Sequence, residues 1–355
     1  MNREFLMLAK HYDFQNHVPG FWFASEKLDG ERCLWDGGVT KGQRAEDVPF
    51  ANTAKDYRLT SVQVSTGLWS RYGKVIHAPH WWTDSLPKKL ILDGELYLGP
   101  GRFQELRRIV GCHTPMNRWD EVQYKCFDVP PPQVLYMDGK IKNPNFEKTF
   151  LGVVEKMLPL YDRDYPIMSF RSAIAFLQRT LITCRYASVV QQDMIPVGDP
   201  KGREFVLENL SRVEEYGGEG LMLRKADSWW SPSRCKELLK VVTEKTAEAT
   251  VIGYWWGEQT DKGSKLLGLM GSLECQDSEG RIFNISGFAD QERVLYRADG
   301  KRADEVGVQN AGLRASADIQ SVLFPLGSAV TYKYKVLTKD GKPREARYWR
   351  KYLGG

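Results

Sequence analysis

Lys27 stands just after an apolar, aromatic run and opens the segment Lys-Leu-Asp-Gly-Glu-Arg over residues 27–32. A lysine that attacks phosphorus must be uncharged, and because its free pKa is about 10.4, burial or nearby cations must lower it. Arg32, Arg71 and Lys240 are candidate cations. The Asp-Gly pair predicts a turn, which would place Lys27 at a strand end facing a cavity. Alone, such a motif is more often an ordinary surface turn.

Two further segments deliver carboxylates. Glu95 lies inside the strand-like run Leu92-Asp93-Gly94-Glu95-Leu96-Tyr97, and Glu219 follows the pair Gly217-Gly218 at the start of another apolar run. A carboxylate in such surroundings needs a hydroxyl, a cation or water, and a hairpin ion pair would serve Glu95 equally well. Magnesium prefers hard oxygen ligands and often takes one or two carboxylates. We therefore predict Glu219 and Glu95 as metal ligands.

Two other strand-like runs end on residues that could hold a nucleotide. Phe127 closes the run 124–127 beside an acid, as a platform for a purine would require, although an ordinary core position is the alternative. Lys240 follows a Leu-Leu pair and could hold its ammonium against a phosphate, although this segment alone favours an exposed strand lysine.

The secondary structure that must position these residues changes along the chain, from mixed strands and helices to short strands alone. Alternating apolar runs predict strands over 20–25, 90–98 and 123–129, and helical spacing predicts helices over 146–158 and 173–181. After about residue 243 the sequence changes to short strands separated by glycine-containing turns, which is typical of a small β-barrel; these strands are predicted over 250–256, 267–275, 281–287 and 329–337. We expect a domain boundary between Val242 and Thr243.

Composition sets broad limits on function. The 50 Lys and Arg against 45 Asp and Glu give a net charge of +5, which fits a polyanionic partner without requiring one. The chain has no run of 18 apolar residues and no signal-peptide pattern, so a cytoplasmic protein without membrane association is expected. The six cysteines are widely scattered, which favours free thiols over a zinc site or a disulfide framework.

Together and in this order, the five segments resemble the nucleotidyltransferase motifs of covalent ligases and mRNA capping enzymes. The closer resemblance is to the minimal two-domain ATP-dependent DNA ligases of bacteria and viruses. It is carried also by Trp-Ser-Arg-Tyr-Gly-Lys at 69–74, Ala-Pro-His-Trp-Trp at 78–82 and Ala-Glu-Ala-Thr-Val-Ile-Gly-Tyr at 247–254. The resemblance implies an α+β fold: an ATP-grasp-like nucleotidyltransferase domain of antiparallel sheets and flanking helices over 1–242, then an all-β OB-fold barrel over 243–355.

The resemblance also implies roles for individual residues. Lys27 would attack the α-phosphate of ATP and carry AMP, with Asp29, Arg32 and Lys240 completing the catalytic set. The residues that would contact the nucleotide are Glu26, Lys27, Arg32, Glu95, Phe127, Glu219 and Lys240. Those that would contact DNA are Ser70, Arg71, Arg344 and Arg347.

The reaction implied is the sealing of a 5′-phosphate/3′-hydroxyl nick in duplex DNA. AMP would move to Lys27, then to the 5′-phosphate, and would leave when the 3′-hydroxyl attacks, so that one difficult condensation becomes three displacements. ATP and Mg²⁺, for which Mn²⁺ can substitute, would be required. We expect a monomer in the cytoplasm, or in the host cytoplasm if the source is viral.

Two alternatives stay open. The same lysine chemistry would serve an RNA-end ligase or a capping guanylyltransferase, which labelling with ATP or GTP would distinguish. The second alternative is a catalytically dead relative that only binds nucleic acid. Nick sealing by the protein would exclude this alternative.

The chain also departs from the family pattern. Val242 stands where a second lysine is usual, and the C-terminal Arg-x-Asp-Lys element of larger relatives is not recognisable. The segment 36–61 is longer than expected and could contact DNA or merely decorate the surface. The polar segment 298–317 could be a DNA-contacting loop, and a disordered insertion is at least as consistent with its sequence.

Overall fold

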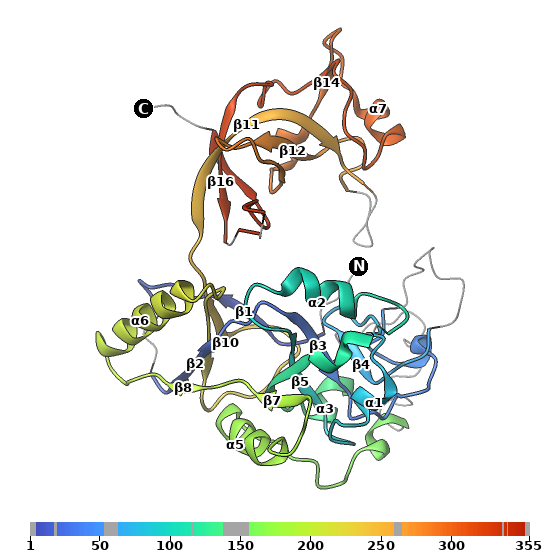
Figure 1. The fold of residues 1–355 in the computed structure, drawn as a ribbon, viewed down its shortest axis with the longest axis vertical. Coiled ribbons are helices and arrows are strands. Elements are labelled where there is room, and N and C mark those ends of the chain that lie inside the picture. The colour runs from blue at the N-terminus through green and yellow to red at the C-terminus, as the bar shows by residue number, and fades with distance from the viewer. Residues whose placement is uncertain are drawn as a thin grey trace. The chain divides into compact units, whose positions relative to one another are not determined.

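A computed structural model describes residues 5–17, 20–52, 63–115, 117–137, 156–258, 265–335, 337–338 and 340–351. The chain divides into two compact units, residues 2–242 and residues 243–355 (Figure 1). The larger unit contains two five-stranded sheets, and the smaller contains one five-stranded and one two-stranded sheet. Most of the helix predicted over 146–158 lies outside the described residues.

The first sheet of the larger unit carries the strands on either side of Lys27. Its order is β1 (Leu8–His11), β10 (Arg234–Val241), β9 (Leu221–Lys225), β2 (Trp22–Glu26) and β8 (Asp193–Met194). Only the β1–β10 pair is parallel. The predicted strand over 20–25 is thereby confirmed, with its bounds moved by one to two residues to Trp22–Glu26.

Helix α6 (Lys201–Glu215) covers one face of this sheet, beside β2 and β10 (Figure 1). Its Val206 and Leu210 are buried in one apolar cluster with Leu223 and Leu239 of the sheet. Because side chains alternate along a strand, Ser25, Met222 and Lys240 must lie on the opposite face. The helix thereby decides which face of the sheet is left for chemistry.

The second sheet has the order β4 (Leu68–Ser70), β3 (Glu31–Trp35), β5 (Leu92–Tyr97), β6 (Gln123–Asp128) and β7 (Ala187–Val189). It confirms the strands predicted over 90–98 and 123–129. The chain therefore changes sheets between β2 and β3, and the segment that makes this crossing contains Lys27.

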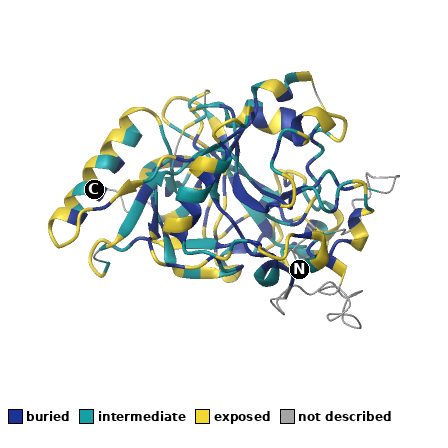
Figure 2. Ribbon diagram, turned by 90° about the horizontal axis from the view of Figure 1, so that it is seen from below, coloured by how far each residue is buried: buried dark blue, intermediate teal, exposed yellow. Residues whose placement is uncertain are grey.

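Helices flank the second sheet. Helix α5 (Phe170–Thr180) packs against β6 and β7, and α2 (Phe103–Val110) packs against β3 and β5. The remaining helical turns of this unit are η1 (Ala45–Asp47), α1 (His80–Thr83), η2 (Asn117–Glu121), α3 (Pro132–Met137) and η4 (Leu158–Leu160). Burial is concentrated in the strands, whereas the outer faces of the helices are exposed (Figure 2).

The described part of the long segment 36–61 belongs to the core of this unit. Asp36 is fully buried, and its carboxylate accepts hydrogen bonds from Trp69 Nε1 and from the Gly38 amide, each at 2.9 Å, and from the Thr40 hydroxyl. Burial raises the pKa of Asp36 to about 6, which these three donors oppose. The alternative that 36–52 merely decorates the surface is therefore wrong, because a fully buried acid ties its first residues to the core; residues 53–62 are outside the described part.

The smaller unit is built around β11 (Lys245–Trp256), which is 12 residues long and pairs antiparallel with two neighbours. Its register shifts after Val251 and after Trp255, which lets one strand bend around the core. The sheet order is β13 (Ile282–Ile285), β12 (Met270–Gln276), β11, β16 (Ala329–Tyr334) and β17 (Arg347–Lys351). The four strands predicted in this region are confirmed.

The segment 298–317 is folded rather than a disordered insertion. It contains α7 (Asp304–Gln309) and lies between the paired strands β14 (Tyr296–Arg297) and β15 (Ile319–Gln320), after the single turn η5 (Asp290–Arg293). A Cβ on Gly307 would lie 2.4 Å from the Trp256 ring, so the helix packs directly on the core of this unit.

All six cysteines are free, as expected, with Cys33, Cys126 and Cys275 buried. Within the described residues, none of the helices combines the length and the apolar character needed to cross a bilayer.

Candidate active site

Lys27 follows the last residue of β2 directly. Its backbone amide donates to the carbonyl of Gly220 at 2.8 Å, which ties the crossing segment to the start of β9. Its Nζ lies 2.5 Å from Glu219 Oε2, and the two side chains are 23% and 13% exposed. The direct charged partner of Lys27 is therefore an acid rather than one of the predicted cations. Before Lys27 can attack, its nitrogen must give up both a proton and this contact.

Gly30 explains why the segment carries a glycine. A Cβ at this position would lie 2.2 Å from the carbonyl oxygen of Leu96 and 2.6 Å from Cγ of Glu95. Gly30 is not among the glycines with positive φ. The sequence predicted that the Asp-Gly pair forms a tight turn. In the structure, Gly30 is needed instead because the crossing segment approaches β5 closely, which brings Lys27 and Glu95 together.

We expect Gly30→Ala to lower the rate of AMP transfer to Lys27 by about 10²-fold, since displacing a reacting group by about 1 Å can have that effect. The obstacle is backbone, the Leu96 carbonyl, which cannot move aside easily. Gly20→Ala is the matched control, because nothing lies within 4 Å of a Cβ there. The measurement is the rate of lysine labelling by α-labelled ATP, and equal rates in the two variants would contradict this explanation.

Asp29 and Glu26 lie on either side of Lys27 and both act electrostatically on Tyr97 at the end of β5. Burial, followed by these two carboxylates, raises the pKa of Tyr97 to about 12. Burial alone raises the pKa of Glu26. The two acids therefore lie beside the second sheet, although their roles in nucleotide binding stay predictions.

The second sheet presents Arg32, Glu95 and Phe127 on one face. Arg32 is in register with Glu95, Glu95 is in register with Lys125, and Phe127 lies two residues further along β6. Phe127 is half-buried and the Arg32 Cζ lies 4.4 Å from its ring centroid. Phe127 is therefore not an ordinary core residue, and one of its ring faces already carries a cation–π contact.

Glu95 lies between charges of both signs. Burial raises the pKa of Glu95 to about 7, with Glu219 adding to the rise and Lys27 and Arg32 opposing it. These four side chains thus form one electrostatic unit drawn from β3, β5 and the segments before β3 and β9. Near neutral pH, the Glu95 carboxyl can exchange a proton or accept a hydroxyl hydrogen bond.

We expect Glu95→Gln to gain stability relative to the wild type as the pH rises. The folded pKa of Glu95, about 7, lies above its ordinary value of 4.5, so the contribution of Glu95 to folding is complete below about 4.5 and is lost as the pH rises through about 7. Glutamine carries no such dependence. Urea unfolding at about pH 5 and about pH 8 checks this linkage, and a difference that does not change with pH would exclude it.

Arg32 is held by an acid that the sequence reasoning did not single out. Asp93 is 1% exposed, and it accepts Arg32 Nε and Nη2 on its two oxygens, both at 2.7 Å. Burial lowers the pKa of Arg32, but the Asp93 carboxylate outweighs this and the net direction is upward. Strand alternation could have found Asp93, because it stands two residues before Glu95 and therefore on the same face.

Lys240 lies on β10 in register with Met222 of β9 and with His11 of β1, on the face opposite α6. Val242 comes directly after the last residue of β10, and one of its methyl carbons lies 3.0 Å from the position of a Cβ on Gly220. An apolar side chain therefore stands beside the carbonyl that anchors Lys27, at the position where a second lysine was expected.

The four predicted DNA contacts fall in different units. Ser70 is buried at the end of β4, and its Oγ accepts the Lys74 amide at 3.1 Å, so the hydroxyl organises a turn. Arg71 follows, with its amide on the Arg32 carbonyl at 3.2 Å. Arg347 begins β17, and Arg344 precedes that strand within the smaller unit. Within the larger unit, this backbone contact places Arg71 beside the strand that carries Arg32.

Among the described residues, no group of three or more His, Cys, Asp and Glu side chains is placed to enclose a metal ion. Glu219 and Glu95 do fit magnesium in its usual nucleotide-bound form, because that form takes one or two carboxylates and completes its shell with phosphate oxygens and water. Both carboxylates lie next to Lys27, where the phosphates would be.

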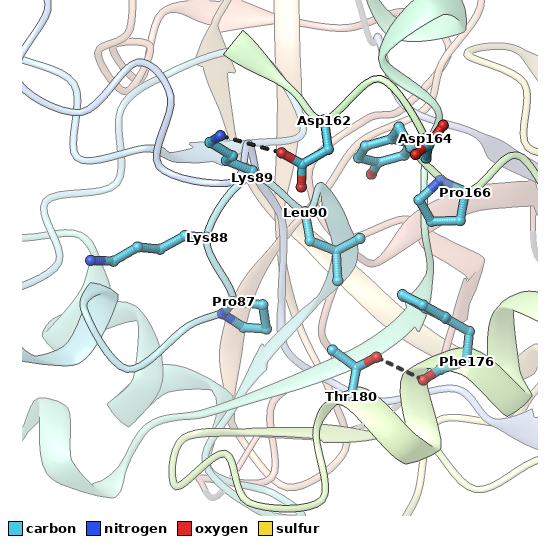
Figure 3. Close-up of a pocket in the computed structure, with 10 residues that line it drawn as sticks. Pro87, Lys88, Lys89, Leu90, Asp162, Asp164, Pro166, Phe176 and Thr180 are labelled. Carbon is cyan, nitrogen blue, oxygen red and sulfur yellow. Dashed lines mark hydrogen bonds and ion pairs between the residues drawn. The ribbon is translucent and has the colours of Figure 1, made fainter.

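A separate cavity of about 210 Å³ lies at the surface of the larger unit (Figure 3). Its lining includes Leu90 and Phe176, and Lys89 pairs with Asp162 across it at 3.3 Å. None of its lining residues belongs to the site around Lys27, so it has no part in the chemistry considered above.

Comparisons with known proteins agree with this architecture. Residues 262–351 match a family model described as a DNA ligase OB-like domain. A DNA ligase of Haemophilus influenzae is 25% identical over 345 residues, which cover 97% of this chain and 91% of that protein. A solved structure from a structure-function analysis of Lig E DNA ligases, which bind DNA with a minimal scaffold, is 26% identical, covers 98% of both chains and has a TM-score of 0.63.

A further solved structure, named Pmar-Lig_Pre, shares the fold at 17% identity, with a TM-score of 0.60 over 100% of this chain and 69% of its own. The predicted fold class, a mixed α/β nucleotidyltransferase domain followed by an OB-fold domain, is confirmed. The match extends over nearly the whole chain and includes both kinds of domain. Over nearly its whole length the chain is similar to DNA ligases, and residues 262–351 match the OB-like domain of that family.

Proposed function

We propose that this ligase seals nicks between a 5′-phosphate and a 3′-hydroxyl in duplex DNA, through AMP carried on Lys27 and then on the DNA. The observation that supports this most directly is the position of Lys27: it lies at a strand end, 2.5 Å from Glu219 and electrostatically coupled to Glu95. A nucleophile beside two carboxylates, with Arg32 and Phe127 on the facing sheet, is suited to receiving a nucleotide.

In the first step the Lys27 nitrogen forms a bond to the α-phosphorus of ATP, and the bond to pyrophosphate breaks. Glu95 holds the ribose, Phe127 stacks on adenine, and Glu26 contacts the base through its backbone. Lys240 and Arg32 place positive charge near the α-phosphate, where charge develops in the transition state. Asp29, next to Lys27 in the crossing segment, supports the same phosphate.

Glu219 and Glu95 would hold Mg²⁺ or Mn²⁺, which when bound supplies charge neutralisation for the phosphates. The contact of Glu219 with Lys27 in the free protein means that Glu219 has two partners to choose between. Its departure from Lys27 leaves the lysine nitrogen free to lose a proton.

In the later steps AMP moves to the 5′-phosphate of the nick, and the 3′-hydroxyl displaces it. Arg71 and Ser70 of the larger unit, and Arg344 and Arg347 of the smaller, are the proposed contacts to DNA. Most protein–DNA hydrogen bonds go to phosphates, and arginine is suited to them. We further propose that the ligase acts as a monomer in the cytoplasm.

The test is to mix the protein with Mg²⁺ and α-labelled ATP or GTP, and then to add a nicked DNA duplex or, in a parallel reaction, nicked RNA. The expected result is a labelled protein with ATP only, and sealed DNA that appears as the label leaves the protein. Labelling by GTP would indicate a capping-type activity, and sealing of nicked RNA instead of DNA an RNA-end ligase. Binding of DNA without label or sealing would indicate a dead relative, and each of these outcomes would overturn the proposal.

We expect Val242→Lys to speed lysine adenylation at limiting ATP, because it adds a cation two residues after Lys240 and next to Gly220. One additional charge-assisted hydrogen bond to phosphate is worth about 1.5 kcal/mol, or roughly tenfold. Val242→Met is the matched control, since it has similar length without charge. An unchanged first-step rate in Val242→Lys would show that another group already makes this phosphate contact.

A further inference from the structure

Trp230 makes a polar contact inside the apolar core of the larger unit. The side chain is 4% exposed, and its indole Nε1 donates to Asp93 Oδ2 at 2.8 Å. The same oxygen accepts Arg32 Nη2, and the other oxygen accepts Arg32 Nε, both at 2.7 Å. The carboxylate of Asp93 thus accepts three hydrogen bonds, two from Arg32 and one from Trp230.

The segment that carries Trp230 is anchored independently of this contact. Between β9 and β10, the Ala226 amide donates to the Phe21 carbonyl, and the Ser228 carbonyl accepts the Phe170 amide, each at 2.9 Å. At the other end, the Ser233 carbonyl accepts the Leu8 amide at 3.0 Å. Backbone bonds to three other parts of the unit hold this segment, so the indole N–H is a fixed reference point.

The fixed position of this donor matters for the orientation of the Asp93 carboxylate, because the rotamer of an aspartate does not by itself fix the plane of its carboxylate. The terminal torsion of aspartate is broad, so the partners of the carboxylate decide its plane. Arg32 binds side-on through two parallel hydrogen bonds, so its guanidinium follows that plane. In this orientation Arg32 lies over the Phe127 ring, at 4.4 Å, and its Nη1 is the edge that Asp93 does not use.

We propose that Trp230 is a positioning residue for nucleotidyl transfer: through Asp93 it sets the direction of the Arg32 guanidinium against Phe127. The inference rests on the proposed function, since it assumes that Arg32 and Phe127 meet the nucleotide. The chain of contacts runs from the segment between β9 and β10, across to β5, and from there to β3 and β6. It couples the two sheets at the point where the nucleotide would lie between them.

The test is single-turnover labelling of Trp230→Phe by α-labelled ATP, in which the rate constant and the final labelled fraction are measured separately. We expect a labelled fraction close to that of the wild type and a rate constant at saturating ATP that is about tenfold lower or more. Trp229→Phe is the matched control, because its side chain is 58% exposed and the change is the same. It should label at the wild-type rate.

A double-mutant cycle with Asp93→Asn separates positioning from general damage. If Trp230 acts through Asp93, the variant Asp93→Asn/Trp230→Phe is no slower than Asp93→Asn alone. Trp230→β-(3-benzothienyl)alanine keeps the bicyclic shape and lacks only the N–H donor. This variant tests the hydrogen bond from Trp230 to Asp93 even if the cavity created by Trp230→Phe unfolds the protein.

Three results would overturn the inference: a wild-type rate constant in Trp230→Phe, a lower labelled fraction with an unchanged rate constant, or losses that multiply in the double variant. Absence of label in the wild type would overturn the proposed function, and the inference with it. Label in the wild type together with a full rate in both Trp230 variants would overturn the inference alone.

Discussion

Lys27→Ala is expected to accept no label from α-labelled ATP, a loss of at least about 10³-fold, which is the scale of removing a covalent nucleophile. The reason is that Lys27 follows β2 directly, pairs with Glu219 at 2.5 Å and acts electrostatically on Glu95. The measurement is the labelled protein band at saturating ATP. Lys225→Ala is the control, because Lys225 is exposed at the end of β9.

The same variant should still seal a nick that already carries AMP on its 5′-phosphate. The bond that forms in the last step joins the 3′-oxygen to phosphorus, and AMP leaves from the DNA rather than from the protein. A Lys27→Ala protein that seals such a substrate is therefore correctly folded and binds DNA. Labelling of Lys27→Ala by ATP would remove the central assignment.

Asp128→Asn is expected to destabilise the larger unit by about 3–5 kcal/mol, the cost of leaving one buried charge without its partner. Arg224 Nη2 lies 3.3 Å from Asp128 Oδ2, with side-chain exposures of 4% and 8%. Burial raises the pKa of Asp128 to about 6 and lowers the pKa of Arg224, and each partner opposes the shift of the other. The measurement is the free energy of unfolding in urea.

Two controls make this prediction specific. Asp162→Asn breaks the exposed contact with Lys89, which is shown in Figure 3, and should change the stability little, since water already solvates both groups. Arg224→Met combined with Asp128→Leu removes both charges and should recover much of the loss, because a buried pair can be replaced by apolar side chains. If Asp128→Asn and Asp162→Asn cost the same, the buried pair does not stabilise the fold.

Much of the fold follows from local sequence patterns. The strand runs ending near Glu26, Tyr97 and Asp128 are apolar and bounded by turn residues, and each forms a strand close to its predicted bounds. Helix α6 was not predicted, although it decides which face of the first sheet is free. Its apolar residues are spaced among many charged ones, and only their contact with the sheet identifies them as core.

The site was predicted less completely. The order of the motifs identifies Lys27, Glu95, Phe127, Glu219 and Lys240 as candidates, but motifs do not state which side chains touch. The sequence predicted that cations lie next to Lys27. Its direct partner is an acid, Glu219, which is 192 residues away in the chain. Asp93 and Trp230, separated by 137 residues, were not identified for the same reason.

The sequence by itself determined the fold class, the resemblance to DNA ligases and the order of the chemical groups along the chain, because these depend on short-range periodicity and on motifs read in order. Only the tertiary structure decided how these groups meet. Gly30 lets the crossing segment approach β5, Glu219 pairs with Lys27, and Trp230 reaches Asp93. The physical reason is that these contacts join strands of two sheets, and their distances are set by the packing of the whole unit and not by any local stretch of chain.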